Sequence, residues 1–166
     1  GHHLWAERYD RDVKDIFAIQ DEITMKIISA LQVKLTVGEM AHLVEKGTKN
    51  LDAYLKALQA NEQYLRTSKQ GNTMAKQLAK EAIALDQKYS VPYMIPASCH
   101  IIDVWFRFSE SPEESIKLAA EAAQKALELD DSDPGTHTTL ASLYINQRQH
   151  DKAIASAKRA LDLGPG

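Results

Sequence analysis

The feature that most constrains this fold is a set of alanines at helical spacing that recurs along the chain. Ala153, Ala157 and Ala160 lie on one face of a predicted helix, and two matching sets lie upstream. The upstream sets are Ala119, Ala123 and Ala126, 34 residues earlier, and Ala75, Ala79 and Ala82, a further 44 residues earlier. Small side chains on an inner face let two helix backbones pack closely, so each set predicts one helix of a hairpin. Recurrence along the chain predicts stacked hairpins.

The last copy, which runs from 133 to 166, has the clearest helix boundaries. Asp133 is a favourable N-cap, and Pro134 suits the first helical position, where a missing N–H costs nothing. A first helix is predicted to about Gln147, and after a polar turn a second helix ends at Gly164. The last copy therefore predicts two short antiparallel helices.

The first copy begins at Asn50, which we expect to cap a helix. Five apolar residues of this helix share a face: Leu51, Tyr54, Leu55, Leu58 and Leu65. We expect a loop from Thr67 to Asn72 and a second helix over 73–85. These residues predict the first hairpin.

The middle copy departs most from the pattern. Its first helix begins near Ser90, and we expect Pro96 to bend or delay it. The copy contains about ten extra residues, which we assign to 103–110, and Ser111 with Pro112 then predicts a helix start. The extra segment contains three of the chain's five Trp and Phe residues, Trp105, Phe106 and Phe108. We expect these aromatics to pack as core beneath the predicted N-terminal helix; the alternative is a recognition element, because aromatic residues dominate interfaces.

The N-terminal part follows a different pattern. Residues 1–11 alternate like a strand, which suggests the end of an upstream α/β segment, and residues 12–48 predict helices that pack on the repeats. The longest predicted helix, 15–35, has apolar residues at every fourth position, and we prefer packing on the first hairpin over a dimeric coiled coil. Thr36 and Glu39 form a capping box for a short helix that ends at Gly47.

The last copy resembles the tetratricopeptide repeat. The seven matching positions are Leu140, Ala141, Tyr144, Ala153, Ala157, Ala160 and Pro165. The resemblance implies an all-α fold, a right-handed superhelix of about three hairpins preceded by a long helix and a short extended segment. The repeats would span about 50–88, 89–132 and 133–166, within a domain over 49–166.

The wider sequence resembles one kind of bacterial multidomain protein. The run His3-Leu-Trp-Ala-Glu-Arg-Tyr-Asp10, followed by Asp15-Ile-Phe-Ala-Ile-Gln-Asp-Glu-Ile23, is similar to the junction between a TolB-like segment and tetratricopeptide repeats. In such proteins the N-terminal module is often a class III adenylate or guanylate cyclase and otherwise a winged-helix regulator. The resemblance implies a location in the bacterial cytoplasm or on the periplasmic side of a membrane-anchored parent, and it does not decide between the two.

Such repeats bind peptides or proteins along a groove formed by their first helices. The positions not needed for packing on that side are predicted to line this groove: Met94, Ser98, Ile101, Ile102, Thr138, Ser142, Ile145 and Asn146. Gly135 and Thr139 stand where a clamp for chaperone tails would need basic residues, so we do not expect that specificity. The partner is therefore expected to be a protein or peptide, including a second copy of this chain; the alternative role is that of a structural spacer.

Other functions are disfavoured by what the sequence lacks. The net charge of −3 and the absence of a basic block argue against nucleic-acid binding, and no apolar run approaches the roughly 20 residues of a membrane span. Cys99 and His100 are neighbours on a helix and so point apart, which argues against a nucleophile and base. The aspartates of 130–133 lack the glycine and glutamate of a calcium loop. We therefore expect no catalytic residue, no cofactor and no metal in this fragment.

Overall fold

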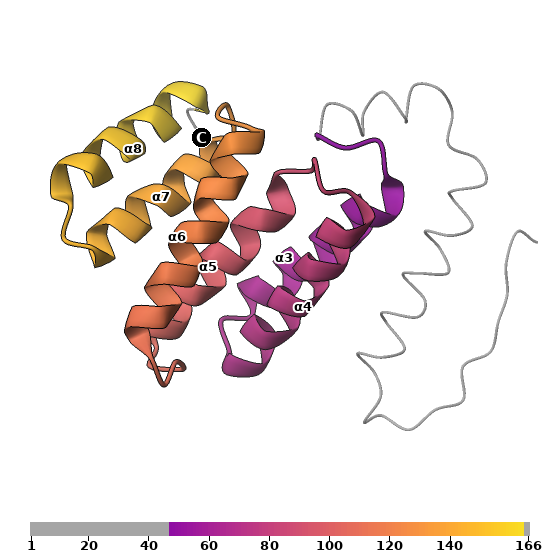
Figure 1. The fold of residues 1–166 in the computed structure, drawn as a ribbon, viewed down its shortest axis with the longest axis horizontal. Helices are drawn as coiled ribbons and strands as arrows, with labels where there is room; N and C mark the ends of the chain where they lie inside the picture. Colours follow the sequence, from indigo (N-terminus) through magenta and orange to yellow (C-terminus); the bar gives the residue numbers. More distant parts are fainter. Residues whose placement is uncertain (1–46, 165–166) are drawn as a thin grey trace, which may run out of the picture. The chain divides into compact units, whose positions relative to one another are not determined.

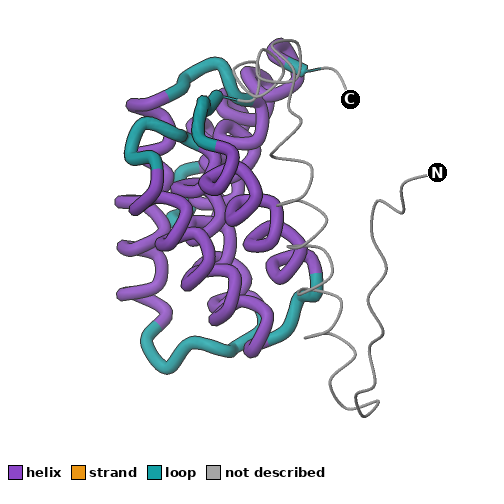
Figure 2. Tube along the Cα trace, turned by 90° about the vertical axis from the view of Figure 1, so that its right-hand side faces the viewer, coloured by secondary structure: helices purple, strands orange, loops and turns teal. Residues whose placement is uncertain are grey.

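The computed structural model describes residues 47–164. The chain divides into two units, 1–41 and 42–166, and the description is confined to the second. Over residues 47–164 the regular secondary structure is entirely helical, with short loops between the helices (Figure 2). The strand predicted over 1–11, the helices predicted within 12–48 and the signature residue Pro165 lie outside the described residues. For 47–164 the prediction of an all-α fold is confirmed.

Six described helices form three consecutive hairpins (Figure 1). They are α3 (Leu51–Leu65), α4 (Lys69–Leu85), α5 (Val91–Trp105), α6 (Pro112–Leu129), α7 (Pro134–Asn146) and α8 (His150–Leu163). The most extensive packing is within the pairs α3–α4, α5–α6 and α7–α8. The hairpins are joined because α4 packs on α5 and α6 packs on α7, while α5 also contacts α3 and α7. The first helices of the hairpins, α3, α5 and α7, thus lie in a row.

Polar side-chain caps set three of the six described helix starts. The side chains of Asn50 and Asp133 accept hydrogen bonds from Ala53 N at 3.1 Å and Thr136 N at 2.6 Å, as predicted. Helix α4 begins at Lys69 and not at residue 73, because Ser68 caps it through Gly71 N at 3.0 Å. The loop between α3 and α4 therefore covers 66–68 and is shorter than the predicted loop of 67–72. Helix α6 begins at Pro112 as predicted, although Ser111 makes no side-chain capping bond.

The alanine sets of the first two hairpins form the core. The alanines of α4 and α6 are 0–1% exposed: Ala75, Ala79, Ala82, Ala119, Ala123 and Ala126. Ile95 and Cys99 of α5 pack in one cluster with the α4 alanines, and Leu140 and Leu143 of α7 pack in another with the α6 alanines. The small residues thus admit the next hairpin, as their spacing predicts.

Two predicted apolar faces are placed differently. In α3 the buried side is formed by Ala53, Ala57 and Ala60, whereas Leu58 is 49% exposed and Leu65 68% exposed. The buried side of α3 accommodates mainly small side chains, so the leucines that share a face with Leu55 are not all core residues. In α8 Ala153 is buried, but Ala157 is exposed, because no described helix covers that side.

The extra residues of the middle hairpin are distributed differently from the prediction. Pro96 lies inside a continuous α5 that begins at Val91, so it does not delay the helix. The extra length is spread over a longer α5, a six-residue loop (106–111) in place of three in the last hairpin (147–149), and a longer α6. Helix α6 has 18 residues where α8 has 14, so the insertion is mostly helical.

Candidate functional site

A small pocket lies between the first helices of the three hairpins. Its volume is about 80 Å³, and we call it the groove pocket. Its lining residues are Tyr64 of α3, Ser98, Ile101, Ile102 and Trp105 of α5, and Thr138, Thr139 and Ser142 of α7. Because three successive hairpins contribute to it, the pocket exists only when they are stacked.

Five of the eight predicted groove residues line this pocket. Ile101 and Ile102 are 2% and 8% exposed, so they are core residues whose outer surface contributes to the pocket. Ser98, Thr138 and Ser142 are more accessible and bring hydroxyl groups. The lining thus combines aliphatic and hydroxyl surface.

The other three predicted groove residues lie outside the pocket lining. Met94 packs over Gly135, where an added Cβ would approach its Sδ to 2.9 Å. Ile145 is 55% exposed. Asn146 does not line the pocket but accepts a hydrogen bond from the Trp105 indole, Nε1 to Oδ1, at 3.0 Å. The sequence pattern therefore places these residues on the correct helices but not all in one site.

Trp105 joins the second and third hairpins. Its indole reaches from the end of α5 to Asn146 at the end of α7, and the Asn146 amide in turn donates from Nδ2 to the Ser142 carbonyl at 2.8 Å. The side chains of Trp105 and Phe106 are both 53% exposed, and Phe106 stacks on Phe108 with ring centroids 5.8 Å apart. Within residues 47–164 neither Trp105 nor Phe106 is enclosed as a core side chain would be, and the expected packing beneath the helix predicted over 15–35 lies outside the described residues.

Two lining residues that were not among the predicted groove residues complete the pocket. Thr139 is 7% exposed, and its hydroxyl is hydrogen-bonded to that of Ser98 at 3.1 Å, which links α7 to α5. Burial raises the pKa of the Tyr64 phenol, the nearby Cys99 raises it further, and a hydrogen bond with Ser98 opposes this shift. Tyr64 lies four residues after the buried Ala60, a spacing that places it on the side of α3 that faces α5. That spacing is the signal that could have found it.

A buried polar cluster lies between α4 and α5. The Asp103 carboxylate, 10% exposed, accepts from Lys76 Nζ at 2.6 Å and from Asn72 Nδ2 at 3.0 Å, and Asn72 Nδ2 also donates to the Cys99 carbonyl at 3.2 Å. The Asp103 carbonyl accepts from the backbone N–H of Phe108 at 2.8 Å. This cluster therefore joins the first two hairpins and holds the loop that follows Trp105.

The side chains beside this cluster are unsuited to acid–base or nucleophilic chemistry. Burial lowers the pKa of His100, with a smaller contribution from Lys76, and Asp103 only partly opposes it, so His100 is neutral at pH 7. Its Nδ1 is 3.9 Å from Asp103 Oδ2, too far for a hydrogen bond. Burial raises the pKa of Cys99 to about 12, so the thiolate that a nucleophile requires does not form at neutral pH.

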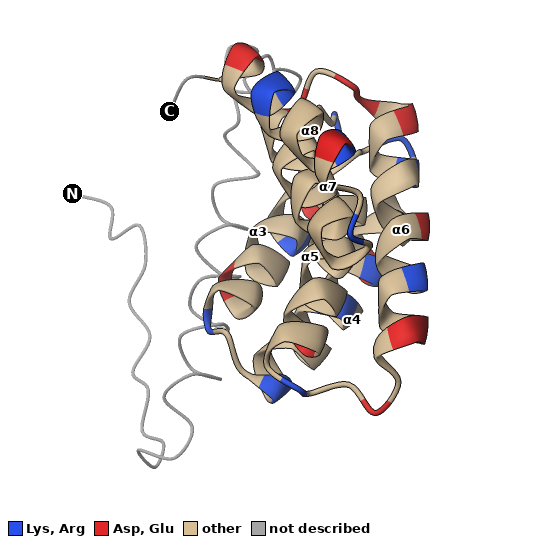
Figure 3. Ribbon diagram, turned by 90° about the vertical axis from the view of Figure 1, so that its left-hand side faces the viewer, with Lys and Arg blue, Asp and Glu red and all other residues tan. Residues whose placement is uncertain are grey.

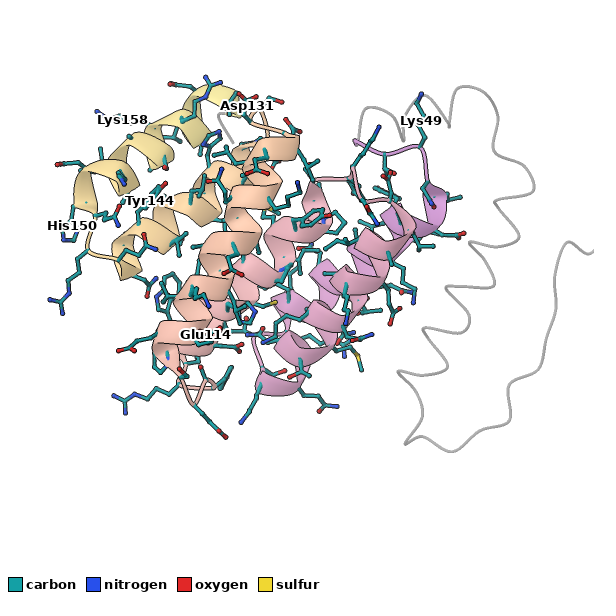
Figure 4. The ribbon with its side chains drawn as sticks, in the orientation of Figure 1. Lys49, Glu114, Asp131, Tyr144, His150 and Lys158 are labelled. Atoms are coloured by element: carbon teal, nitrogen blue, oxygen red, sulfur yellow. The ribbon has the colours of Figure 1, made fainter. Side chains whose placement is uncertain are left out.

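The described surface carries both signs of charge. Acidic and basic residues alternate along α6 (Figure 3). Charged side chains such as Glu114 and Lys158 point away from the helices (Figure 4). Within residues 47–164, no group of three or more His, Cys, Asp or Glu side chains is placed to bind a metal ion. Among the helices described, none is both long and apolar enough to cross a bilayer.

This chain is similar in sequence to one part of a much longer known protein. It is 32% identical over 153 residues to a protein of Rhizobium meliloti (strain 1021) named "Putative adenylate cyclase 3". The aligned region covers 92% of this chain and 26% of that relative, so the chain spans about a quarter of the relative's length. No family model matches the sequence, and no solved structure matches it. The chain is thus similar to one part of a longer protein.

Proposed function

We propose that this chain is a non-catalytic tetratricopeptide-repeat module of a larger bacterial signalling protein, an adenylate cyclase-like one, and that it binds a protein segment through the groove pocket. The observation that carries the proposal is the pocket itself, formed jointly by α3, α5 and α7. A scaffold that served only as a spacer would need the alanine core between hairpins but no accessible pocket on the first helices.

The repeat assignment is supported by the alternation of the hairpins. Each described hairpin lies within one of the three expected repeat ranges, and the alanine positions of α4 and α6 are buried against the first helix of the next hairpin. Solenoids built in this way expose their first helices as a binding surface. The cyclase-like parent is supported by the similarity to "Putative adenylate cyclase 3".

The non-catalytic role is supported by the chemistry of the described residues. Cys99 is fully buried with a raised pKa, His100 is neutral and its Nδ1 has no hydrogen-bond partner. A catalytic nucleophile and base need mutual contact and access to substrate. Binding therefore fits these residues better than catalysis.

Site-directed photocrosslinking in the full-length parent protein tests the proposal. A photoreactive residue at Thr138, in the groove pocket, is compared with one at Thr73, which is exposed on α4 and lines a different pocket outside the row of first helices. Both threonines make the same bond to the carbonyl four residues earlier, at 3.0 and 2.9 Å, so the two sites are matched locally. We expect a covalent adduct from position 138 and none from position 73.

The mass of the adduct identifies the partner class. A product of twice the parent mass indicates self-association, and a product of another mass indicates a different protein. No adduct from position 138, with the chain folded, means that the hairpins act as a spacer and contradicts the proposal.

A further inference from the structure

The groove pocket has a chemistry that restricts its ligand. None of its eight lining residues is charged at neutral pH, although 26% of the chain is charged. Its side-chain polar groups are hydroxyls and the Trp105 indole N–H, which donates to Asn146, and the hydroxyls of Ser98 and Thr139 bond to each other. A charged ligand group would lose its hydration here and gain no opposite charge, which is strongly unfavourable.

The size of the pocket restricts the ligand further. An apolar cavity of roughly 150 Å³ holds a benzene ring. The groove pocket, at about 80 Å³, is too small for an aromatic ring but large enough for a side chain with a few heavy atoms. Its floor does not adapt easily, because Ile101 and Thr139 are buried in the packing of α5 against α7.

Trp105 provides the adjacent contact surface. About half of its side chain is exposed, and its orientation is set by the bond to Asn146, which is itself held by the Ser142 carbonyl. An aromatic ring that is held in place before binding loses little conformational freedom on binding, and tryptophan is one of the residue types enriched at the energetic centres of interfaces.

We propose that the groove pocket receives one small uncharged side chain, of the size of Ala, Ser, Thr or Val, from a protein segment that lies across α5 and α7 against the Trp105 indole. This inference rests on the proposed function and names the class of segment that the pocket recognises. Trp105 and the hydroxyl-lined pocket together set the specificity.

Two substitutions separate the pocket from the rest of the surface. Thr138→Leu adds aliphatic volume at an exposed pocket position and leaves the buried core unchanged. Thr73→Leu is its matched control in the separate pocket on α4, with the same local hydrogen bond lost. Circular dichroism of both variants verifies that helix content is retained.

The probe is a displayed library of randomised heptapeptides, selected on the whole 166-residue chain. Binding of enriched peptides is measured through the fluorescence of Trp105 in a Trp5→Phe background, because these are the chain's two tryptophans. We expect enriched peptides to share one small uncharged position, and replacement of that position by Asp, Lys or Phe to weaken binding at least about tenfold. Thr138→Leu should weaken binding by a similar factor, and Thr73→Leu should not.

The remaining outcomes overturn the inference in distinguishable ways. Enriched peptides that need a charged or aromatic residue at the shared position, or that bind Thr138→Leu as well as the unsubstituted chain, refute the pocket specificity and leave the proposed binding function intact. If no peptide is enriched and the crosslinker at position 138 gives no adduct, both the inference and the proposed function fail.

Discussion

Replacing Lys76, which is paired with the buried Asp103, should destabilise this protein far more than replacing a lysine whose ion pair is similarly short but more exposed. Lys76 Nζ is 2.6 Å from Asp103 Oδ2, and the two side chains are 28% and 10% exposed. Substitution by Met keeps the aliphatic stem of the lysine but removes its charge. The Asp103 carboxylate is then left beneath the protein surface with the Asn72 amide, at 3.0 Å, as its hydrogen-bond donor.

The size of the expected loss of stability follows from the burial of Asp103, the partner that stays charged. Breaking a buried pair costs about 3–5 kcal/mol because an uncompensated charge is left behind. Asp103 keeps one hydrogen bond and is not fully buried, so we expect about 3 kcal/mol for Lys76→Met. The matched control is Lys56, which pairs with Glu81 at 2.7 Å where the side chains are 30% and 40% exposed. An exposed pair contributes about 0.2–1 kcal/mol, so Lys56→Met should cost no more than that.

Urea denaturation followed by far-ultraviolet circular dichroism at neutral pH measures both costs. A third variant, Lys76→Met with Asp103→Leu, removes both charges and should be about 2 kcal/mol more stable than Lys76→Met alone. The reasoning is refuted if Lys76→Met costs no more than Lys56→Met, or if the double variant is the least stable of the three.

Three further predictions concern α5. Because Cys99 is fully buried and its pKa is raised to about 12, a thiol reagent should leave the native protein unlabelled and react only as urea unfolds it; fast native labelling would contradict this. Since the folded pKa of His100 lies below its ordinary 6.5, the unfolded chain binds the extra proton, so stability is fully present above pH 6.5 and falls as the pH drops below it. In His100→Gln the pH dependence of the unfolding free energy should be shallower there, by at most about 1.4 kcal/mol per pH unit, and an unchanged slope would refute the assignment. Ile101→Ala should destabilise by about 2–4 kcal/mol and Trp105→Ala by less, because Ile101 is 2% and Trp105 53% exposed; thermal unfolding that reverses this order would place Trp105 in the core.

Several helix boundaries were predictable from local signals, although the Ser68 cap that starts α4 was missed. Asn50, Asp133 and Pro134 act within one turn, so their effect is visible in the sequence and appears in the structure. The alanine sets of α4 and α6 were predictable for a similar reason, because only small residues permit that backbone approach. Pro96 does not delay α5, because the packing of α5 against four other helices outweighs the local penalty of a proline within the helix.

The candidate site was less predictable because it depends on contacts between hairpins. Tyr64 and Thr139 join the pocket only through the packing of α3 and α7 on α5, and neither lies within a motif. The exposure of Trp105 could not be deduced from its aromatic character, since core and interface favour the same residue types. The Asp103 cluster requires α4 and α5 to meet in one register, and the helical period of a single helix does not contain that information.

Because the hairpins are buried to different degrees, the helices should unfold locally at different free-energy costs. Helix α5 contacts four other helices, whereas α8 packs on α7 and has Ala153 as its one buried residue. Amide hydrogens in α8 should therefore exchange with solvent through detachment of that helix alone, while those of α5 should exchange only when the array as a whole unfolds. A hydrogen-exchange profile of this chain would then rise in protection from α8 to α5.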